Sequence, residues 1–334
     1  MAELAPIAIS MGEPAGIGPD LILQLYAARD EHKLPPFIVM GSVGFLAARA
    51  RRLGLNINFA ETTVADAVGH FPVALPVGHI DGLVPDKPGE ISLLSGKVVI
   101  ESISRAVSET LAGACRAVVT GPIHKATLHK AGFKYPGHTE YLAALCATKQ
   151  GTPHPVMMLA HNDLRVVPLT IHVPLRDVPD LVTAKLIRDT VLIVEHDLRT
   201  RFGIPEPRLA VTGLNPHAGE SGSIGTEDRD IVLPAVIDLQ HNGSNVEGPL
   251  SADTAFHLPN WQKYDAVIAM YHDQALIPIK AIAFDEAINI TLGLPLVRTS
   301  PDHGTAFELA GTGNASPASM LAAIRLADRL TAGA

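Results

Sequence analysis

Three histidines stand where apolar, strand-like runs end, in the segments TIHVPL, GLNPHAGE and MYHDQ. They are His172, His217 and His272. Short apolar runs with β-branched members predict buried strands, and in open α/β sheets ligands gather just beyond the carboxyl ends of the strands. Three neutral imidazoles with an open coordination position form a catalytic type of metal site. The pattern therefore indicates a three-histidine metal site, although each histidine taken singly could be an ordinary half-buried residue.

Asp273 follows His272 directly, and its role stays open between two interpretations. A carboxylate beside a metal-ligating histidine commonly orients the imidazole ring. The same residue type also caps the first turn of a helix. Asp253, in the segment SADT, is expected to be a helix cap that could also reach the site.

Polar residues interrupt apolar segments after the third histidine. Lys280 lies in LIPIKAIAF, Asn289 lies in AINITL, and Arg298 follows shortly after. Burying such groups without partners costs a few kcal/mol, so they either pair internally or point into a ligand site. Because Arg offers paired donors and Lys offers a point charge, these residues predict an oxyanion pocket.

Two further segments have both a structural and a functional interpretation. In GHTE, Thr139 is expected to cap a helix, and the alternative is a phosphate site with His138 and the exposed helix amides. In HKATLHKAG, Lys125 is expected on a solvated helix face, although it could face a site. The segment GEPAGIGPD matches no dinucleotide fingerprint and no P-loop, so it predicts a strand-to-helix turn that could contact a ligand.

Strand-like and helical patterns alternate along the chain, which predicts an α/β protein with mostly parallel sheets flanked by helices. Its 334 residues suffice for two domains. We expect residues 1–135 plus 300–334 to form the first α/β domain and residues 136–299 to form the second. The first domain would then use both ends of the chain.

Composition limits the classes of partner. A formal net charge of −8 gives no support for a nucleic-acid surface. No apolar run approaches the roughly 18 residues that a membrane helix needs, and no signal peptide is recognisable. Cys115 and Cys146 lie far apart in the sequence and are expected to be buried, reduced thiols. These features predict a cytoplasmic protein that binds neither nucleic acid nor membranes.

The chain resembles the 4-hydroxythreonine-4-phosphate dehydrogenase family of vitamin B6 biosynthesis. The resemblance runs nearly end to end, through GEPAGIGPD, TGPIHK, GHTE, GLNPHAGE, ADT, MYHDQ, INITLGLP and RTSPDHGTAFELAG. It implies a two-domain fold similar to isocitrate and isopropylmalate dehydrogenases. It also implies a homodimer whose active site lies in the domain cleft and at the subunit interface.

The resemblance also implies roles for individual residues. His172, His217 and His272 would bind a divalent metal (zinc, magnesium or cobalt), with ligands drawn from both subunits. The phosphorylated amino-acid substrate would be contacted by His138, Thr139, Lys280, Asn289 and Arg298. NAD or NADP would be the oxidant, with no binding residue assigned, and Lys280 or Asp253 could be the general base.

The implied reaction is oxidation of 4-phosphooxy-L-threonine at C3, with decarboxylation to 3-amino-2-oxopropyl phosphate. Two alternatives stay open. One is a related dehydrogenase that acts on a four-carbon phosphosugar acid such as D-threonate 4-phosphate. The other is a three-histidine metallohydrolase, in which a metal-bound hydroxide attacks an ester.

Overall fold

The computed structural model describes residues 4–332, which belong to two compact units. The first unit runs to Pro155 and resumes at Leu294, and the second is Val156–Gly293. The first unit thus contains segments from both ends of the sequence, and the chain crosses into the second unit after Pro155. The physical reason is that α7 (His138–Leu145) packs against α5 (Gly96–Leu111), a helix of the first unit.

The sheet of the first unit has the strand order β3-β4-β2-β1-β5-β12, and its pairings are parallel. The strands are β1 (Ile7–Ser10), β2 (Phe37–Gly41), β3 (Phe59–Glu61), β4 (Leu75–His79), β5 (Ala117–Thr120) and β12 (Arg298–Pro301). β1, β2 and β5 are short and buried along their whole length, as expected for a parallel sheet covered on both faces. Ser10 lies opposite Met40 and Thr120, so the segments after these strands leave at one edge.

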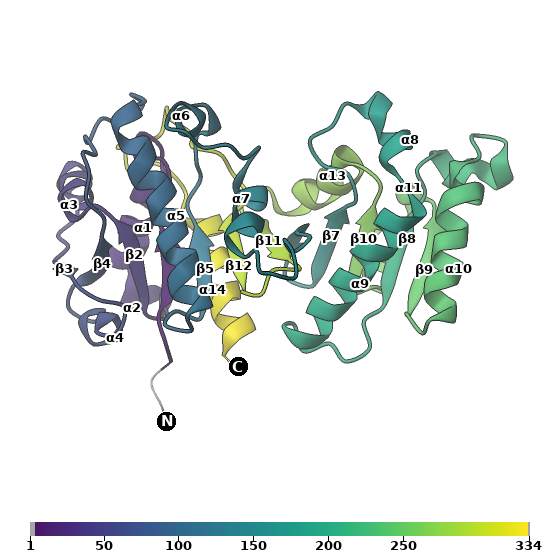
Figure 1. Ribbon diagram of the computed structural model, residues 1–334, viewed down its shortest axis with the longest axis horizontal. Coiled ribbons are helices and arrows are strands. Elements are labelled where there is room, and N and C mark those ends of the chain that lie inside the picture. Colours follow the sequence, from purple (N-terminus) through teal and green to yellow (C-terminus); the bar gives the residue numbers. More distant parts are fainter. Residues whose placement is uncertain (1–3, 333–334) are drawn as a thin grey trace. The chain divides into compact units, whose positions relative to one another are not determined.

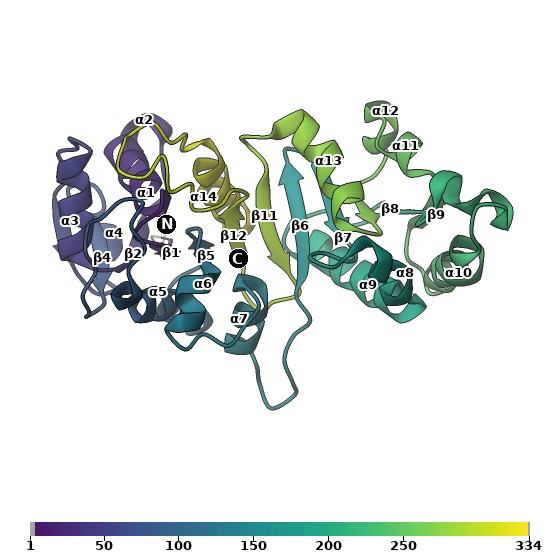
Figure 2. The same ribbon diagram turned by 90° about the horizontal axis from the view of Figure 1, so that it is seen from above.

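Helices cover both faces of this sheet, with α5, α6 and α7 on one side and α1 and α14 on the other (Figures 1 and 2). Besides α5 and α7 they are α1 (Gly18–Ala27), α2 (Arg29–His32), α3 (Val43–Arg52), α4 (Ala67–His70), α6 (Lys125–Lys130) and α14 (Ala318–Thr331). In α5, the buried residues Val99, Ile103, Ala106 and Val107 recur at helical spacing and form the face toward the core.

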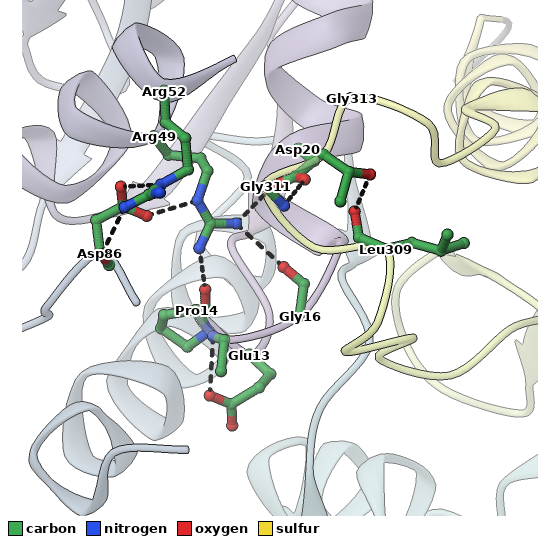
Figure 3. Close-up of polar contacts among 12 residues, drawn as sticks. Glu13, Pro14, Gly16, Asp20, Arg49, Arg52, Asp86, Leu309, Gly311 and Gly313 are labelled. Carbon is green, nitrogen blue, oxygen red and sulfur yellow. Dashed lines mark hydrogen bonds and ion pairs between the residues drawn. The ribbon is translucent and has the colours of Figure 1, made fainter. Parts of the chain in front are cut away.

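A buried arginine holds three loops of the first unit together (Figure 3). The Arg49 side chain is fully buried and donates to the carbonyls of Pro14 and Gly16, to Asp86 (Nε to Oδ1, 2.6 Å) and to buried Asp20. The other Asp20 oxygen accepts the Gly311 N–H at 2.6 Å. Burial raises the pKa of Asp20 even though Arg49 acts in the opposite direction. The loops at this edge therefore depend on one desolvated ion pair.

The sheet of the second unit has the strand order β11-β6-β7-β10-β8-β9. Its strands are β6 (Val156–His161), β7 (Leu164–Pro168), β8 (Leu209–Thr212), β9 (Val246–Leu250), β10 (Ala266–Ala269) and β11 (Ile288–Leu292). β7, β10, β8 and β9 are parallel, whereas β6 is antiparallel to both of its neighbours. The four parallel strands deliver their following segments to one edge.

Helices α9 and α10 lie on one side of this sheet and α13 on the other (Figure 2). The helices are α8 (Val178–Leu181), α9 (Ala184–Thr200), α10 (Leu233–His241), α11 (Ala252–Ala255), α12 (Leu258–Trp261) and α13 (His272–Ala283). Ala275 and Ile279 of α13 pack on Leu159, Val166 and Val267 of the sheet. Within residues 4–332, no helix has both the length and the apolar character needed to span a membrane.

We expect Arg49→Met to lower the free energy of unfolding by about 3–5 kcal/mol, because it leaves the Asp20 carboxylate buried without its cation. Urea unfolding followed by circular dichroism measures the change. Arg52→Met is the matched control, since half-exposed Arg52 pairs with the same Asp86 and its loss should cost no more than about 1 kcal/mol. Equal shifts in the two variants would contradict the role given to Arg49.

Candidate active site

His172 and His272 come together at the carboxyl edge of the second unit. His172 follows β7 and His272 begins α13 after β10, and their ring centroids lie 5.8 Å apart. The Thr170 hydroxyl donates to the Met270 carbonyl at 2.8 Å and ties the two segments to each other. Two imidazoles at this spacing can serve one metal ion, and the metal site expected from the sequence stays a prediction.

Asp273 contacts the imidazole beside it. Its Oδ1 lies 2.6 Å from His272 Nδ1, while Tyr271, which precedes α13, makes no side-chain cap. Of the two interpretations of Asp273, the structure therefore favours the carboxylate that orients the ring. The other ring nitrogen of His272, Nε2, is then the one suited to bind a ligand.

Gln274 fastens the strands that carry this edge. Its Oε1 accepts hydrogen bonds from the Met270 N–H (2.6 Å) and the Thr212 hydroxyl (2.8 Å), and its Nε2 donates to the Gly213 carbonyl (2.8 Å). One amide thus joins the carboxyl ends of β8 and β10. The sequence analysis did not single out Gln274, because a lone amide two residues after a histidine carries no recognisable signal.

His217 lies on an unusual turn after β8. From His217 to Ser221, five consecutive residues have positive φ, between 44° and 75°, and only Gly219 among them lacks a side chain. Left-handed backbone costs roughly 1–2 kcal/mol for each residue with a side chain. Buried Asp228 compensates, since its carboxylate accepts the N–H groups of Leu214 (2.6 Å) and Asn215 (3.0 Å). The strain is therefore held in place at a segment expected to carry a metal ligand.

Asp253 lies near His217, at the start of α11. The Ser251 hydroxyl donates to its carboxylate and, with a smaller electrostatic contribution from His217, holds the pKa of Asp253 below its usual range. Asp253 is exposed and lies in the first turn of α11, whereas Ser251 occupies the cap position, so the expected cap is displaced by two residues.

The third histidine does not complete a site within one chain. Across residues 4–332, no three His, Cys, Asp or Glu side chains gather closely enough to hold a metal ion. His172 and His272 supply two adjacent imidazoles, and His217 lies by Asp253 at the end of a neighbouring strand. Within these residues, the three histidines thus do not form one metal-sized cluster.

Lys280 and Asn289 lie on the same face of the second unit's sheet. Asn289 is opposite Leu159 in the antiparallel pairing of β11 and β6, so both side chains point toward α13. Lys280 is on α13 with its ammonium 5.3 Å from the Phe284 ring centre. Asn289 therefore lies on the side of the sheet that α13 covers, and Lys280 lies on α13 itself.

The first unit holds a separate group of cationic side chains. Arg298 on β12 is 3% exposed and donates from Nη2 to the Thr120 hydroxyl at 2.6 Å. Burial lowers its pKa to about 10. Burial, then the charges of Arg298 and Lys125, hold the pKa of His138 well below its usual range. His138 thus stays neutral at physiological pH, beside two cations.

One expectation changes here. Thr139 is not the helix cap, because α7 begins at His138 and extended Gly137 takes the cap position. Lys125 is exposed, as expected, and its Nζ lies 3.5 Å from the position that a Cβ would take on Gly137. In the sequence, the position of Lys125 shortly after the Gly-Pro turn that follows β5 indicates that it could lie near the sheet edge. Cys115 and Cys146 are buried free thiols, as expected.

Known proteins resemble this chain over almost its whole length. The family model described as pyridoxal phosphate biosynthetic protein PdxA matches residues 33–327. A 4-hydroxythreonine-4-phosphate dehydrogenase of Methylorubrum populi is 52% identical, over 97% of this chain and 94% of that protein. The crystal structure of the enzyme of that name from Klebsiella pneumoniae has a TM-score of 0.85 at 38% identity and covers 98% of this chain and 99% of its own.

A more distant relative has another activity in its name. The structure of a terephthalate 1,2-cis-dihydrodiol dehydrogenase from Burkholderia xenovorans has a TM-score of 0.65 at 28% identity, over 97% of each chain. The family match and the 52% identical relative together settle the family. The chain belongs to the family of pyridoxal phosphate biosynthetic protein PdxA.

We expect Asp228→Ala to release the left-handed turn, because the N–H groups of Leu214 and Asn215 lose a buried acceptor. Hydrogen–deuterium exchange of residues 214–222 should become at least tenfold faster. Asp230→Ala is the matched control, since Asp230 is exposed and pairs with Arg229. Unchanged protection in the Asp228 variant would show that the turn holds without this carboxylate.

Proposed function

We propose that this chain is a 4-hydroxythreonine-4-phosphate dehydrogenase, which oxidises 4-phosphooxy-L-threonine at C3 and yields 3-amino-2-oxopropyl phosphate after loss of CO2. One observation carries the proposal: the adjacent imidazoles of His172 and His272 stand at the sheet edge of a chain 52% identical to an enzyme of that name. A metal-binding pair and a distinct cationic group suit a substrate that has both a reacting alcohol and a phosphate.

The metal in this proposal is held by His172 and His272 of one protomer and by His217 of a partner subunit. The donors fit a divalent cation such as zinc, magnesium or cobalt, because Asp273 orients one ring and the paired rings lie 5.8 Å apart. A single chain gathers no three-ligand cluster within residues 4–332, which is why the third ligand is assigned to a second copy. When bound, the cation supplies Lewis-acid polarisation of the hydroxyl and of the developing enolate.

We propose a homodimer, because a second copy would supply the third ligand. Large apolar side chains are exposed on the same segments as the metal-binding pair: Leu175 is 68% exposed, Ile277 64% and Phe284 72%. Exposed apolar side chains of this size commonly mark association surfaces. Contact between two copies through these segments would bring a second chain to His172 and His272.

The remaining residues bind the substrate. We assign the phosphate and neighbouring polar groups to His138, Thr139, Arg298, Lys280 and Asn289. Arg298 supplies a fixed guanidinium, because its Nη2 is held by Thr120. His138 is kept neutral, so it donates or accepts a hydrogen bond without adding charge. These contacts orient C3 toward the oxidant.

Proton removal from the C3 hydroxyl needs a base, and the geometry favours Lys280 over Asp253. The lowered pKa of Asp253 makes its carboxylate a weak proton acceptor near neutral pH. Lys280 lies on the helix that His272 begins. The hydroxyl proton goes to the base and the C3 hydrogen leaves as hydride to NAD or NADP. The 3-keto acid then loses CO2 and gains a proton.

The proposal extends to the cellular setting. Burial raises the pKa of Cys115 to about 12 and that of Cys146 to about 11, so both thiols stay protonated. Two unpaired thiols suit a reducing compartment, and we therefore propose that the enzyme is cytoplasmic.

Purified protein should reduce NAD or NADP in the presence of 4-phosphooxy-L-threonine and a divalent metal. Absorbance of the reduced nicotinamide measures turnover, and D-threonate 4-phosphate is the competing substrate. Turnover of only the second substrate would move the enzyme to the phosphosugar-acid dehydrogenases. Ester hydrolysis without nicotinamide reduction would instead establish a metallohydrolase.

Mixing inactive histidine variants tests the shared metal site. His217→Ala and His272→Ala should each lose bound metal, as measured by elemental analysis, and nearly all activity. When the two are unfolded together and refolded, about half the dimers are mixed and each has one intact site, so about a quarter of wild-type activity should return.

The matched control is a mixture of His172→Ala with His272→Ala, which should recover nothing because both ligands come from one protomer. Recovery in this control, with none in the first mixture, would contradict the proposed pairing.

A further inference from the structure

We propose that Lys125 is a further phosphate-binding residue, which grips the substrate's phosphate together with His138 and Arg298. The inference rests on the proposed function for the identity of the substrate. It concerns only side chains of the first unit, and it assigns a role to a lysine that the sequence places on a solvated helix.

The backbone fixes the place of Lys125. It is the first residue of α6, after the turn that ends β5. Gly121 in that turn packs so closely on the loop after β1 that an added Cβ would meet Gly12 N at 3.0 Å. The Glu13 N–H also donates to the Pro122 carbonyl at 2.8 Å. This packing and this hydrogen bond hold the turn, and with it the start of α6, against the edge of the sheet.

The side chain of Lys125 reaches the segment that begins α7. Its Cε and Nζ lie 3.4 Å and 3.5 Å from the Cβ position built on Gly137. The charge of Lys125 contributes to the lowered pKa of His138, which follows Gly137 in the sequence. Figure 2 shows α6 and α7 on the same side of the sheet. Lys125 thus lies beside the polar residue that the sequence connects with phosphate.

Lys125, Arg298 and Glu140 together carry one net positive charge. Among residues 4–332, Lys125 forms no ion pair within 4.0 Å. Glu140 Oε2 lies 3.2 Å from the position that a Cβ would take on Gly137, so one carboxylate belongs to the same group. Buried Arg298 adds a second cation that acts on His138, and His138 Nε2 is buried without a hydrogen-bond partner. Such a cluster gains most from an anion.

A phosphomonoester matches this group best. It carries close to two negative charges and three acceptor oxygens, so it can take a guanidinium, an ammonium and an imidazole N–H at once. Lys125 is exposed, so a bound phosphate can reach its ammonium from solvent, whereas Arg298 is buried. Lys125 then contributes mainly to binding of the substrate and little to the chemistry at C3.

Lys125→Met should raise KM for 4-phosphooxy-L-threonine at least tenfold, with kcat changed less than about threefold, because the lost contact is remote from C3. Affinity for inorganic phosphate, measured by isothermal titration calorimetry without the other substrates, should fall by a similar factor. Lys125→Arg should restore most of both. Lys130→Met, at the exposed end of the same helix, is the matched control and should leave both values unchanged.

The outcomes separate this inference from the proposed function. Normal turnover with the same KM and phosphate affinity in Lys125→Met and wild type would overturn the inference and leave the function standing. If the wild type does not turn over 4-phosphooxy-L-threonine, loss of phosphate affinity only in Lys125→Met would still support the phosphate site. Equal losses in the Lys125 and Lys130 variants would reduce the effect to general surface charge and overturn the inference.

Discussion

The segments that leave the carboxyl edges of both sheets must have their backbone polar groups satisfied where water is excluded, and this requirement shapes each candidate site. In the first unit, one arginine satisfies this requirement. Arg49 is fully buried and donates hydrogen bonds to the carbonyls of Pro14 and Gly16. In the second unit, the Gln274 amide and the Asp228 carboxylate meet it. Each is a single polar side chain that holds several loop atoms, so the loops gain fixed shapes without regular structure. Buried polar side chains, and not only apolar packing, therefore fix the loops around the candidate sites.

Electrostatics separates the two groups of functional side chains. His172 and His272 lie next to the Asp273 carboxylate, which suits binding of a cation. In the other unit, His138 experiences two positive charges, which suits binding of an anion. A phosphorylated amino alcohol would use both environments. Its phosphate is stabilised by positive charge, and its reacting hydroxyl is activated by a bound cation. This division of charge agrees with the family to which the chain belongs.

The α/β class could be read from the sequence, because short apolar runs alternate with helical patterns along the chain. The exact strand ends could not, since β7 ends at Pro168 and three residues separate it from His172. Other features depend on tertiary contacts that leave no local pattern. The five-residue left-handed turn around His217 is held by Asp228, and no residue pattern in GLNPHAGE predicts this backbone conformation. Lys125 is exposed, as its sequence context predicts, but its nearness to Gly137 at the start of α7 has no local signal. Helix α13 continues through Pro278, a residue that normally argues for a helix end.

The use of both chain ends in the first unit has a consequence for biogenesis. β5 pairs with β12, yet the second unit lies between them in the sequence. While the ribosome is still making that insertion, β5 lacks its later neighbour and presents an open edge with unmatched amides and carbonyls. The nascent amino-terminal part is therefore vulnerable to wrong pairing during translation, a period when chaperones guard such surfaces.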